Sequence, residues 1–128
     1  MTNITNTQST TLSLPRLLLH LEGAGVFIAS IILFSQLGLA WWIYPLLILA
    51  PDVFMVGYLL DTTRGAWVYN IGHLYVVPIT LGLIAFFANW TLGIGIALIW
   101  MGHIGMDRML GYGMKYPTHF KDTHLSRI

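Results

Sequence analysis

Apolar residues dominate four long stretches of this chain, and each stretch is about as long as a helix that spans a bilayer. The stretches cover residues 17–37, 41–60, 65–88 and 90–110. A spanning helix needs about 20 mostly apolar residues, so the pattern predicts an all-α membrane protein with four transmembrane helices. Because the connections are short, successive helices are expected to pack antiparallel in one bundle.

The composition agrees with this class. Of 128 residues, 56% are hydrophobic and only 9% are charged, whereas soluble domains carry about 25% charged residues. The net charge of +1 gives no indication of nucleic-acid binding, and the lack of cysteine excludes thiolate metal sites and a thiol nucleophile. We expect one helical domain at 16–110, a disordered or interfacial tail at 1–15, and a cytoplasmic interfacial tail at 111–128.

The basic residues predict the orientation of the helices. With four spans, both termini and the connection between the second and third spans lie on the same side of the membrane. All six lysines and arginines fall on that side, at Arg16, Arg64, Arg108, Lys115, Lys121 and Arg127. Because cytoplasmic loops are enriched in Lys and Arg, both termini are expected in the cytoplasm.

Five ionisable side chains interrupt the apolar stretches, and no lysine or arginine is expected deep in these stretches to neutralise them. They are Glu22, Asp52, His73, His103 and Asp107. A charged group at bilayer depth costs at least about 2.5–3.5 kcal/mol, so a functional role is expected. At about 1.5 Å per residue, four of them lie roughly 9–12 Å from the cytoplasmic ends of their helices, with Asp107 a turn shallower. One polar group from each helix thus reaches the same layer.

Helical periodicity places several of these residues on shared faces. His103 and Asp107 are four residues apart and stack on one side of the fourth helix. Asn70 and His73 are three apart on the third helix and also share a side. These spacings predict that the polar groups of the two helices point at the same space.

Small residues and prolines predict two further features. Glu22 shares its face with Gly25 and Ala29, and small residues mark close helix packing in membranes, so this face is expected to point into the bundle. Pro51 and Pro78 lie inside apolar stretches. Each is expected to bend its helix, and such breaks are tolerated where they line a cavity.

Imidazoles and carboxylates without a thiolate suit a divalent zinc, iron or manganese ion. The five ionisable side chains would be the ligands, and Asp52, Asn70 and Asp107 the catalytic residues. In that interpretation an acid serves as general base and Asn70 orients a ligand or the substrate. The apolar outer half of the bundle favours a hydrophobic or lipid-like substrate. The Glu-x-x-His and His-Glu-x-x-His signatures are absent, so the reaction stays open.

Three other functions remain open from the sequence. In a proton- or cation-coupled transporter or channel subunit the same acids would titrate, and four helices would need a homo-oligomer to form a pathway. In a haem protein His73 and His103 would be the two axial ligands. In a non-catalytic membrane subunit the polar layer would only fix the helix register. In the C-terminal tail, His119, Asp122 and His124 are expected either to close the inner mouth of the site or to lie in an interfacial anchor.

Several short motifs resemble one known family. They are Leu21-Glu22-Gly23, Ala50-Pro51-Asp52, Tyr69-Asn70-x-x-His73, His103-Ile104-Gly105-Met106-Asp107-Arg108, Gly111-Tyr112-Gly113-x-Lys115-Tyr116 and Lys121-Asp122-Thr123-His124-Leu125. The chain resembles, over residues 16–128, a family of small bacterial membrane proteins catalogued as domain of unknown function 4260. The resemblance implies a bacterial inner-membrane protein of four spans, and it implies no activity.

Overall fold

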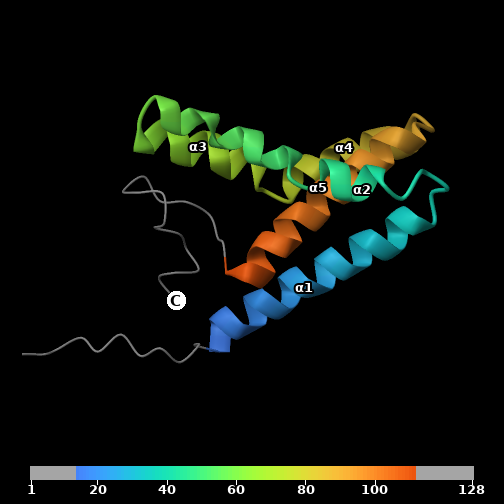
Figure 1. Ribbon diagram of the computed structural model, residues 1–128, viewed down its shortest axis with the longest axis horizontal. Coiled ribbons are helices and arrows are strands. Elements are labelled where there is room, and N and C mark those ends of the chain that lie inside the picture. Colours follow the sequence, from blue (N-terminus) through green and yellow to red (C-terminus); the bar gives the residue numbers. More distant parts are fainter. Residues whose placement is uncertain (1–13, 112–128) are drawn as a thin grey trace, which may run out of the picture.

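The computed structural model describes residues 14–111, and these residues form helices without any strand (Figure 1). The elements in chain order are α1 (Leu14–Ser35), α2 (Ile43–Leu47), the 3-10 helix η1 (Ala50–Leu59), α3 (Thr62–Gly72), α4 (Val76–Phe87) and α5 (Thr91–Leu110). The prediction of an all-helical protein is confirmed.

The two middle stretches are interrupted, where the sequence pattern predicted uninterrupted helices. η1 follows α2 after a break at 48–49, and α4 follows α3 after a break at 73–75. Pro51 and Pro78 explain these positions, because proline has no N–H for the carbonyl one turn earlier and its ring crowds that carbonyl. The bends expected at the two prolines are therefore complete breaks in the helices.

α1 packs along α5 through a contact between their backbones (Figure 1). A Cβ atom added to Gly23 would lie 2.6 Å from the Gly105 oxygen, and one added to Gly105 would lie 2.7 Å from the Gly23 oxygen. Ser30 and Phe34 continue the same face of α1 and are buried. Glycine thus allows the two backbones to approach more closely than any side chain would permit.

The sequence predicted a different inward face of α1, and that prediction is wrong. Glu22, Gly25 and Ala29 are exposed, and a Cβ added to Gly25 would meet nothing within 4 Å. Each residue turns a helix by about 100°, so Glu22 lies beside the contact line that begins at Gly23. Small residues occur on both faces, and only the position of α5 decides which face is used.

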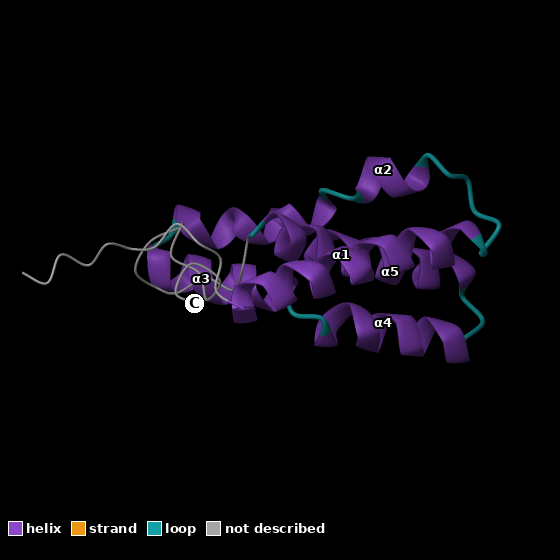
Figure 2. Cartoon of the chain, turned by 90° about the horizontal axis from the view of Figure 1, so that it is seen from below, coloured by secondary structure: helices purple, strands orange, loops and turns teal. Residues whose placement is uncertain are grey.

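α5 is the central element of the fold. It packs against α1 on one side and α4 on another, and it also touches η1 and α2 (Figure 2). η1 packs mainly against α3, where Gly65 and Gly72 leave room for the rings of Tyr58 and Phe54. The two interrupted stretches therefore meet α5 close to their breaks.

Two helical stretches within residues 14–111 are long and apolar enough to cross a membrane, Leu14–Ser35 and Thr62–Phe87. Large apolar side chains also cover much of the outside of the molecule. Leu21 is 59% exposed, Ile32 56% and Phe87 80%. Extensive exposed apolar surface marks a membrane or protein interface.

Candidate metal centre

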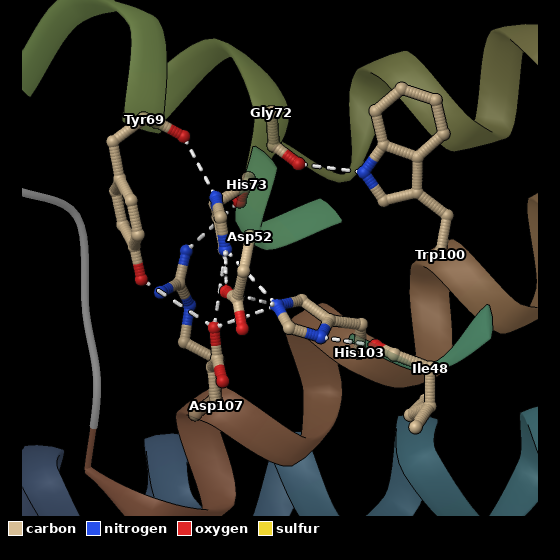
Figure 3. Close-up of polar contacts among 9 residues, drawn as sticks. Ile48, Asp52, Tyr69, Gly72, His73, Trp100, His103 and Asp107 are labelled. Carbon is tan, nitrogen blue, oxygen red and sulfur yellow. Dashed lines mark hydrogen bonds and ion pairs between the residues drawn. The ribbon is translucent and has the colours of Figure 1, made fainter. Parts of the chain in front are cut away.

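Four ionisable side chains meet where the breaks face α5 (Figure 3). Asp52 lies in the first turn of η1, and His73 caps the C-terminal end of α3. His103 and Asp107 come from α5. One ligand atom from each of the four lies within 4.8 Å of all the others. The structure therefore brings together four of the five side chains that the sequence selected.

The separations between these atoms match those of ligands around a single ion. The Nε2 atoms of His73 and His103 are 3.1 Å apart, and Asp107 Oδ2 is 3.3 Å from each of them. Asp52 Oδ1 is 3.1 Å from His103 Nε2 and 3.6 Å from His73 Nε2. Tetrahedral ligands at about 2.0–2.1 Å from zinc stand roughly 3.3–3.4 Å from one another.

The other ring nitrogen of each histidine faces a backbone carbonyl. His73 Nδ1 is 2.8 Å from the Tyr69 oxygen, and His103 Nδ1 is 2.5 Å from the Ile48 oxygen. Because a carbonyl only accepts hydrogen bonds, each Nδ1 carries the hydrogen, and in a neutral ring Nε2 then presents its lone pair. Two lone pairs thus face each other beside two carboxylates, and such a group of acceptors requires a cation or additional protons between them.

The break before η1 supplies the carbonyl that orients His103. Pro51 has no N–H, and the Asp52 N–H donates to the Leu49 oxygen at 3.1 Å. Neither residue 51 nor residue 52 therefore donates a hydrogen bond to the Ile48 oxygen, which accepts one from His103 instead. The same proline that interrupts the helix thus frees the acceptor that fixes this imidazole.

The C-terminal end of α3 orients His73 in a similar way. The His73 N–H donates to the Asn70 oxygen at 3.1 Å, which leaves the Tyr69 oxygen to accept from the His73 ring. The Gly72 oxygen accepts from Trp100 Nε1 at 2.6 Å. The carbonyl end of a helix carries partial negative charge, so this end of α3 is also a favourable neighbour for a cation.

Burial distinguishes Asp52 from the other three. The side chains of His73 and His103 are 0% and 1% exposed and that of Asp107 is 11% exposed, whereas 40% of the Asp52 side chain is exposed. The centre is therefore closed on the side of the histidines and Asp107, and its accessible side lies at Asp52.

Arg108 corrects the expectation that no basic residue reaches this layer. It is only 8% exposed, and its Nη2 donates to the His73 oxygen at 3.3 Å. The sequence placed Arg108 among the cations at the cytoplasmic boundary. Its stem packs against α1, because a Cβ added to Gly23 would lie 2.5 Å from the Arg108 Cβ. The glycine contact thus holds this side chain inside the protein.

The remaining candidates lie elsewhere. Glu22 is exposed on α1 and lines a groove of 440 Å³ outside the four-residue centre. Asn70 is half-buried and is not one of the four, although its backbone oxygen caps His73. His119, Asp122 and His124 lie outside the described residues.

Sequence reasoning missed Tyr69 and the backbone of Ile48. The Tyr69 hydroxyl donates to Asp107 Oδ2 at 3.5 Å, and its ring stacks on His73 with centroids 3.8 Å apart. Tyr69 is one turn before His73 on the same helix, so its spacing carried a usable signal. The role of Ile48 depends only on its backbone oxygen, and no side-chain pattern could indicate it.

The family model described as Domain of unknown function (DUF4260) matches residues 16–128, so the chain belongs to this family. This confirms the resemblance seen in the sequence motifs. No curated protein and no solved structure matches the chain. The residues of the centre are therefore the basis for assigning a function.

Proposed function

We propose that this member of a family without an assigned activity is a membrane metalloenzyme that acts on a hydrophobic, lipid-like substrate. Asp52, His73, His103 and Asp107 would hold one divalent metal ion. One observation carries the proposal: two neutral imidazoles and two carboxylates direct their lone pairs at a common point. The hydrogen bonds to Tyr69 and Ile48 are the kind of outer contacts that orient metal-binding histidines.

Zinc suits the centre best. The donors are nitrogen and oxygen, and the five separations of 3.1 to 3.6 Å suit a tetrahedron better than an octahedron, whose neighbouring ligands stand about 3.0 Å apart at a metal distance near 2.1 Å. Iron and manganese accept the same donors. A haem is disfavoured, because oxygens of Asp52 and Asp107 lie at the point where the porphyrin would have to fit between the histidines.

The four residues would have different roles. When bound, the ion would polarise a carbonyl or phosphoryl oxygen or activate a water molecule. His73 and His103 are fixed by their carbonyl partners, and Asp107 receives the Tyr69 hydroxyl, so these three would be the rigid ligands of the ion and Asp52 the adaptable fourth. Asp52 is exposed enough to meet a substrate. We assign to Asp52 the exchange of protons with the reacting group.

We further propose that the protein lies in the bacterial inner membrane with four spans and both termini in the cytoplasm. The exposed apolar surface and the two stretches of spanning length support insertion. The interrupted segments are compatible with membrane depth, because the carbonyls of Ile48, Tyr69, Gly72 and His73 accept hydrogen bonds from side chains.

Metal analysis of the full chain, purified in detergent and refed with zinc, iron or manganese, tests the function. We expect about one zinc ion per chain in the wild-type protein. His103→Ala should lose at least about 90% of it while its melting temperature stays within a few degrees of that of the metal-free wild type. His20→Ala, which removes a histidine that bonds to the Met109 oxygen and is not one of the four, should retain zinc. Metal at wild-type stoichiometry in His103→Ala would contradict the proposal.

A second measurement separates the enzyme from the transporter. A metal content near zero in all preparations, together with ion flux in liposomes that Asp52→Asn abolishes, would favour a centre that carries protons instead of metal. Bound zinc without flux would support the metalloenzyme.

A further inference from the structure

We propose that an apolar pocket beside the metal centre binds a single hydrocarbon chain of the substrate and so presents the substrate's polar group to the centre at Asp52. This inference rests on the proposed function, since it assigns the substrate class of the same site. The pocket lies between the α2–η1 segment and α5 and has a volume of 320 Å³. That volume is at the small end of the range of ligand pockets, about 300–1,000 Å³.

The lining of the pocket is apolar. It includes Ala50, Pro51 and Phe54 from η1 and Ile96, Ile99 and Trp100 from α5. A sugar or nucleotide placed here would lose hydrogen bonds to water without gaining any from these side chains. A hydrocarbon chain loses none, so the chemistry of the lining selects an apolar occupant.

The pocket and the metal centre lie next to each other along one face of α5. Ile96, Ile99 and His103 follow one another at spacings of three and four residues, and Asp107 follows four residues later. These spacings place all four on one face of α5. Ile99 and His103 are therefore slightly more than one turn, or roughly 6 Å, apart along the helix axis. A chain in the pocket would end beside the ion.

On η1, opposite α5, a residue that lines the pocket is likewise followed by a residue of the centre. Pro51 lines the pocket, and the next residue, Asp52, is the exposed ligand of the centre. Because His73 and His103 are fully buried, a substrate approaches the ion from the side of Asp52. The wall of the pocket at Pro51 is therefore one residue from the accessible side of the centre.

One wall of the pocket is rigid. The Trp100 ring is held by its hydrogen bond to the Gly72 oxygen at 2.6 Å and stacks on Phe54 with centroids 5.7 Å apart. A fixed wall limits the width of the pocket, which favours one extended chain over a bulky ring system. Such a chain can arrive sideways from a bilayer, where the molecule exposes apolar side chains.

The test uses alkyl hydroxamates, from acetohydroxamate to octanohydroxamate, as probes that combine a metal-binding group with a chain of chosen length. The detergent-solubilised full chain is loaded with cobalt, and binding is followed by the change in visible absorption of the ion. Cobalt content is measured first on each preparation. In the wild type we expect affinity to rise at least about tenfold from two to eight carbons, because added methylenes enter the pocket.

Two variants fill the pocket from opposite sides. Ala50→Phe and Ile96→Trp should both bind acetohydroxamate as the wild type does. In both variants the affinity should rise by no more than about threefold from two to eight carbons. Ala88→Phe makes the same change at an exposed position beyond α4 and should keep the full gain. Partition of each probe into detergent is common to all variants and cancels in the comparison.

The outcomes separate the two proposals. If cobalt binds but both pocket variants keep the wild-type dependence on chain length, the pocket does not hold the chain and only this inference is overturned. If no cobalt binds, the metal function itself fails and the inference fails with it. If one pocket variant does not bind acetohydroxamate normally, the dependence on chain length in the other variant decides.

Discussion

α1 and α5 are continuous helices whose backbones touch at Gly23 and Gly105, whereas the two stretches packed with them, 43–59 and 62–87, are each interrupted once. The continuous pair is held mainly by this close backbone packing, and His20 of α1 also bonds to the Met109 oxygen of α5. The interrupted stretches leave backbone carbonyls free, and these carbonyls accept from His73, His103, Trp100 and Arg108.

The difference teaches how a small helical protein combines a scaffold with a polar centre. Regular helices have few free backbone groups in their interior, so they supply ligands but cannot orient them. The breaks supply the orienting acceptors. α5 belongs to both regions, since it packs on α1 and carries His103 and Asp107. The comparison can be tested by changes that should affect one region and spare the other.

Removal of metal should have the largest effect, and only on the interrupted stretches. The ion would join η1, α3 and α5, and an ion present at 100 times its Kd stabilises the bound state by about 2.7 kcal/mol. After treatment with a chelator, amide hydrogen exchange at residues 50–53 and 70–75 should quicken by about 100-fold. Exchange in the middle of α1 should change little. An equal increase in both regions would contradict the difference between the continuous pair and the interrupted stretches.

Gly23→Ala should damage the continuous pair. The new Cβ would lie 2.5 Å from the Arg108 Cβ and 2.6 Å from the Gly105 oxygen, and overpacking of this kind costs about 1–3 kcal/mol. Unfolding in a denaturing-detergent titration measures the loss. Gly25→Ala is the matched control, because its Cβ meets nothing within 4 Å and should cause no loss of stability. Equal stability of the two variants would show that α1 and α5 do not touch at Gly23.

Pro51→Ala should weaken metal binding about tenfold, as loss of an orienting contact does. The new N–H at position 51 would compete for the Ile48 oxygen, which now accepts from His103. A competition titration with a zinc-binding dye measures the change. Pro45→Ala makes the same change at an exposed position of α2, where the new N–H does not follow Ile48 in the chain; it should bind zinc as the wild type does. Unchanged affinity in Pro51→Ala would separate the helix break from the orientation of His103.

Trp100→Phe should have the smallest effect. It removes the hydrogen bond to the Gly72 oxygen and keeps an aromatic ring beside Phe54, so we expect a loss of about 1 kcal/mol. The melting temperature measures this loss on preparations of known zinc content. Zinc stoichiometry should remain that of the wild type, and its loss would mean that the end of α3 depends on Trp100 to place His73.

Much of the centre could be predicted from the sequence because depth along a helix follows from counting residues. Asp52, His73 and His103 lay in one predicted layer, and Asp107 was expected one turn shallower on the same face as His103; the structure brings the four together. Glu22 lay in the same layer but is exposed. The depth of a residue follows from its own helix alone, whereas the direction in which its side chain points depends on where the neighbouring helix packs. α1 has small residues on more than one face, so its packing face could not be identified from the sequence.

The breaks were predictable in position but not in consequence. Pro51 and Pro78 mark where helical hydrogen bonds must fail. Which donor then bonds to a freed carbonyl depends on the packing of α5. The hydrogen bond from His103 to the Ile48 oxygen could therefore not be predicted from the residue pattern. The inward position of Arg108 depends on the Gly23 contact for the same reason.

The fixed hydrogens on the two Nδ1 atoms have a consequence for how an ion would be captured. An imidazole free to rotate must give up that freedom when it binds metal, and the lost entropy weakens the affinity. Here both rings are already held by Tyr69 and Ile48. The entropy cost of ordering the two rings is therefore met when the chain folds. Only the more exposed carboxylate of Asp52 would lose conformational freedom when the ion binds.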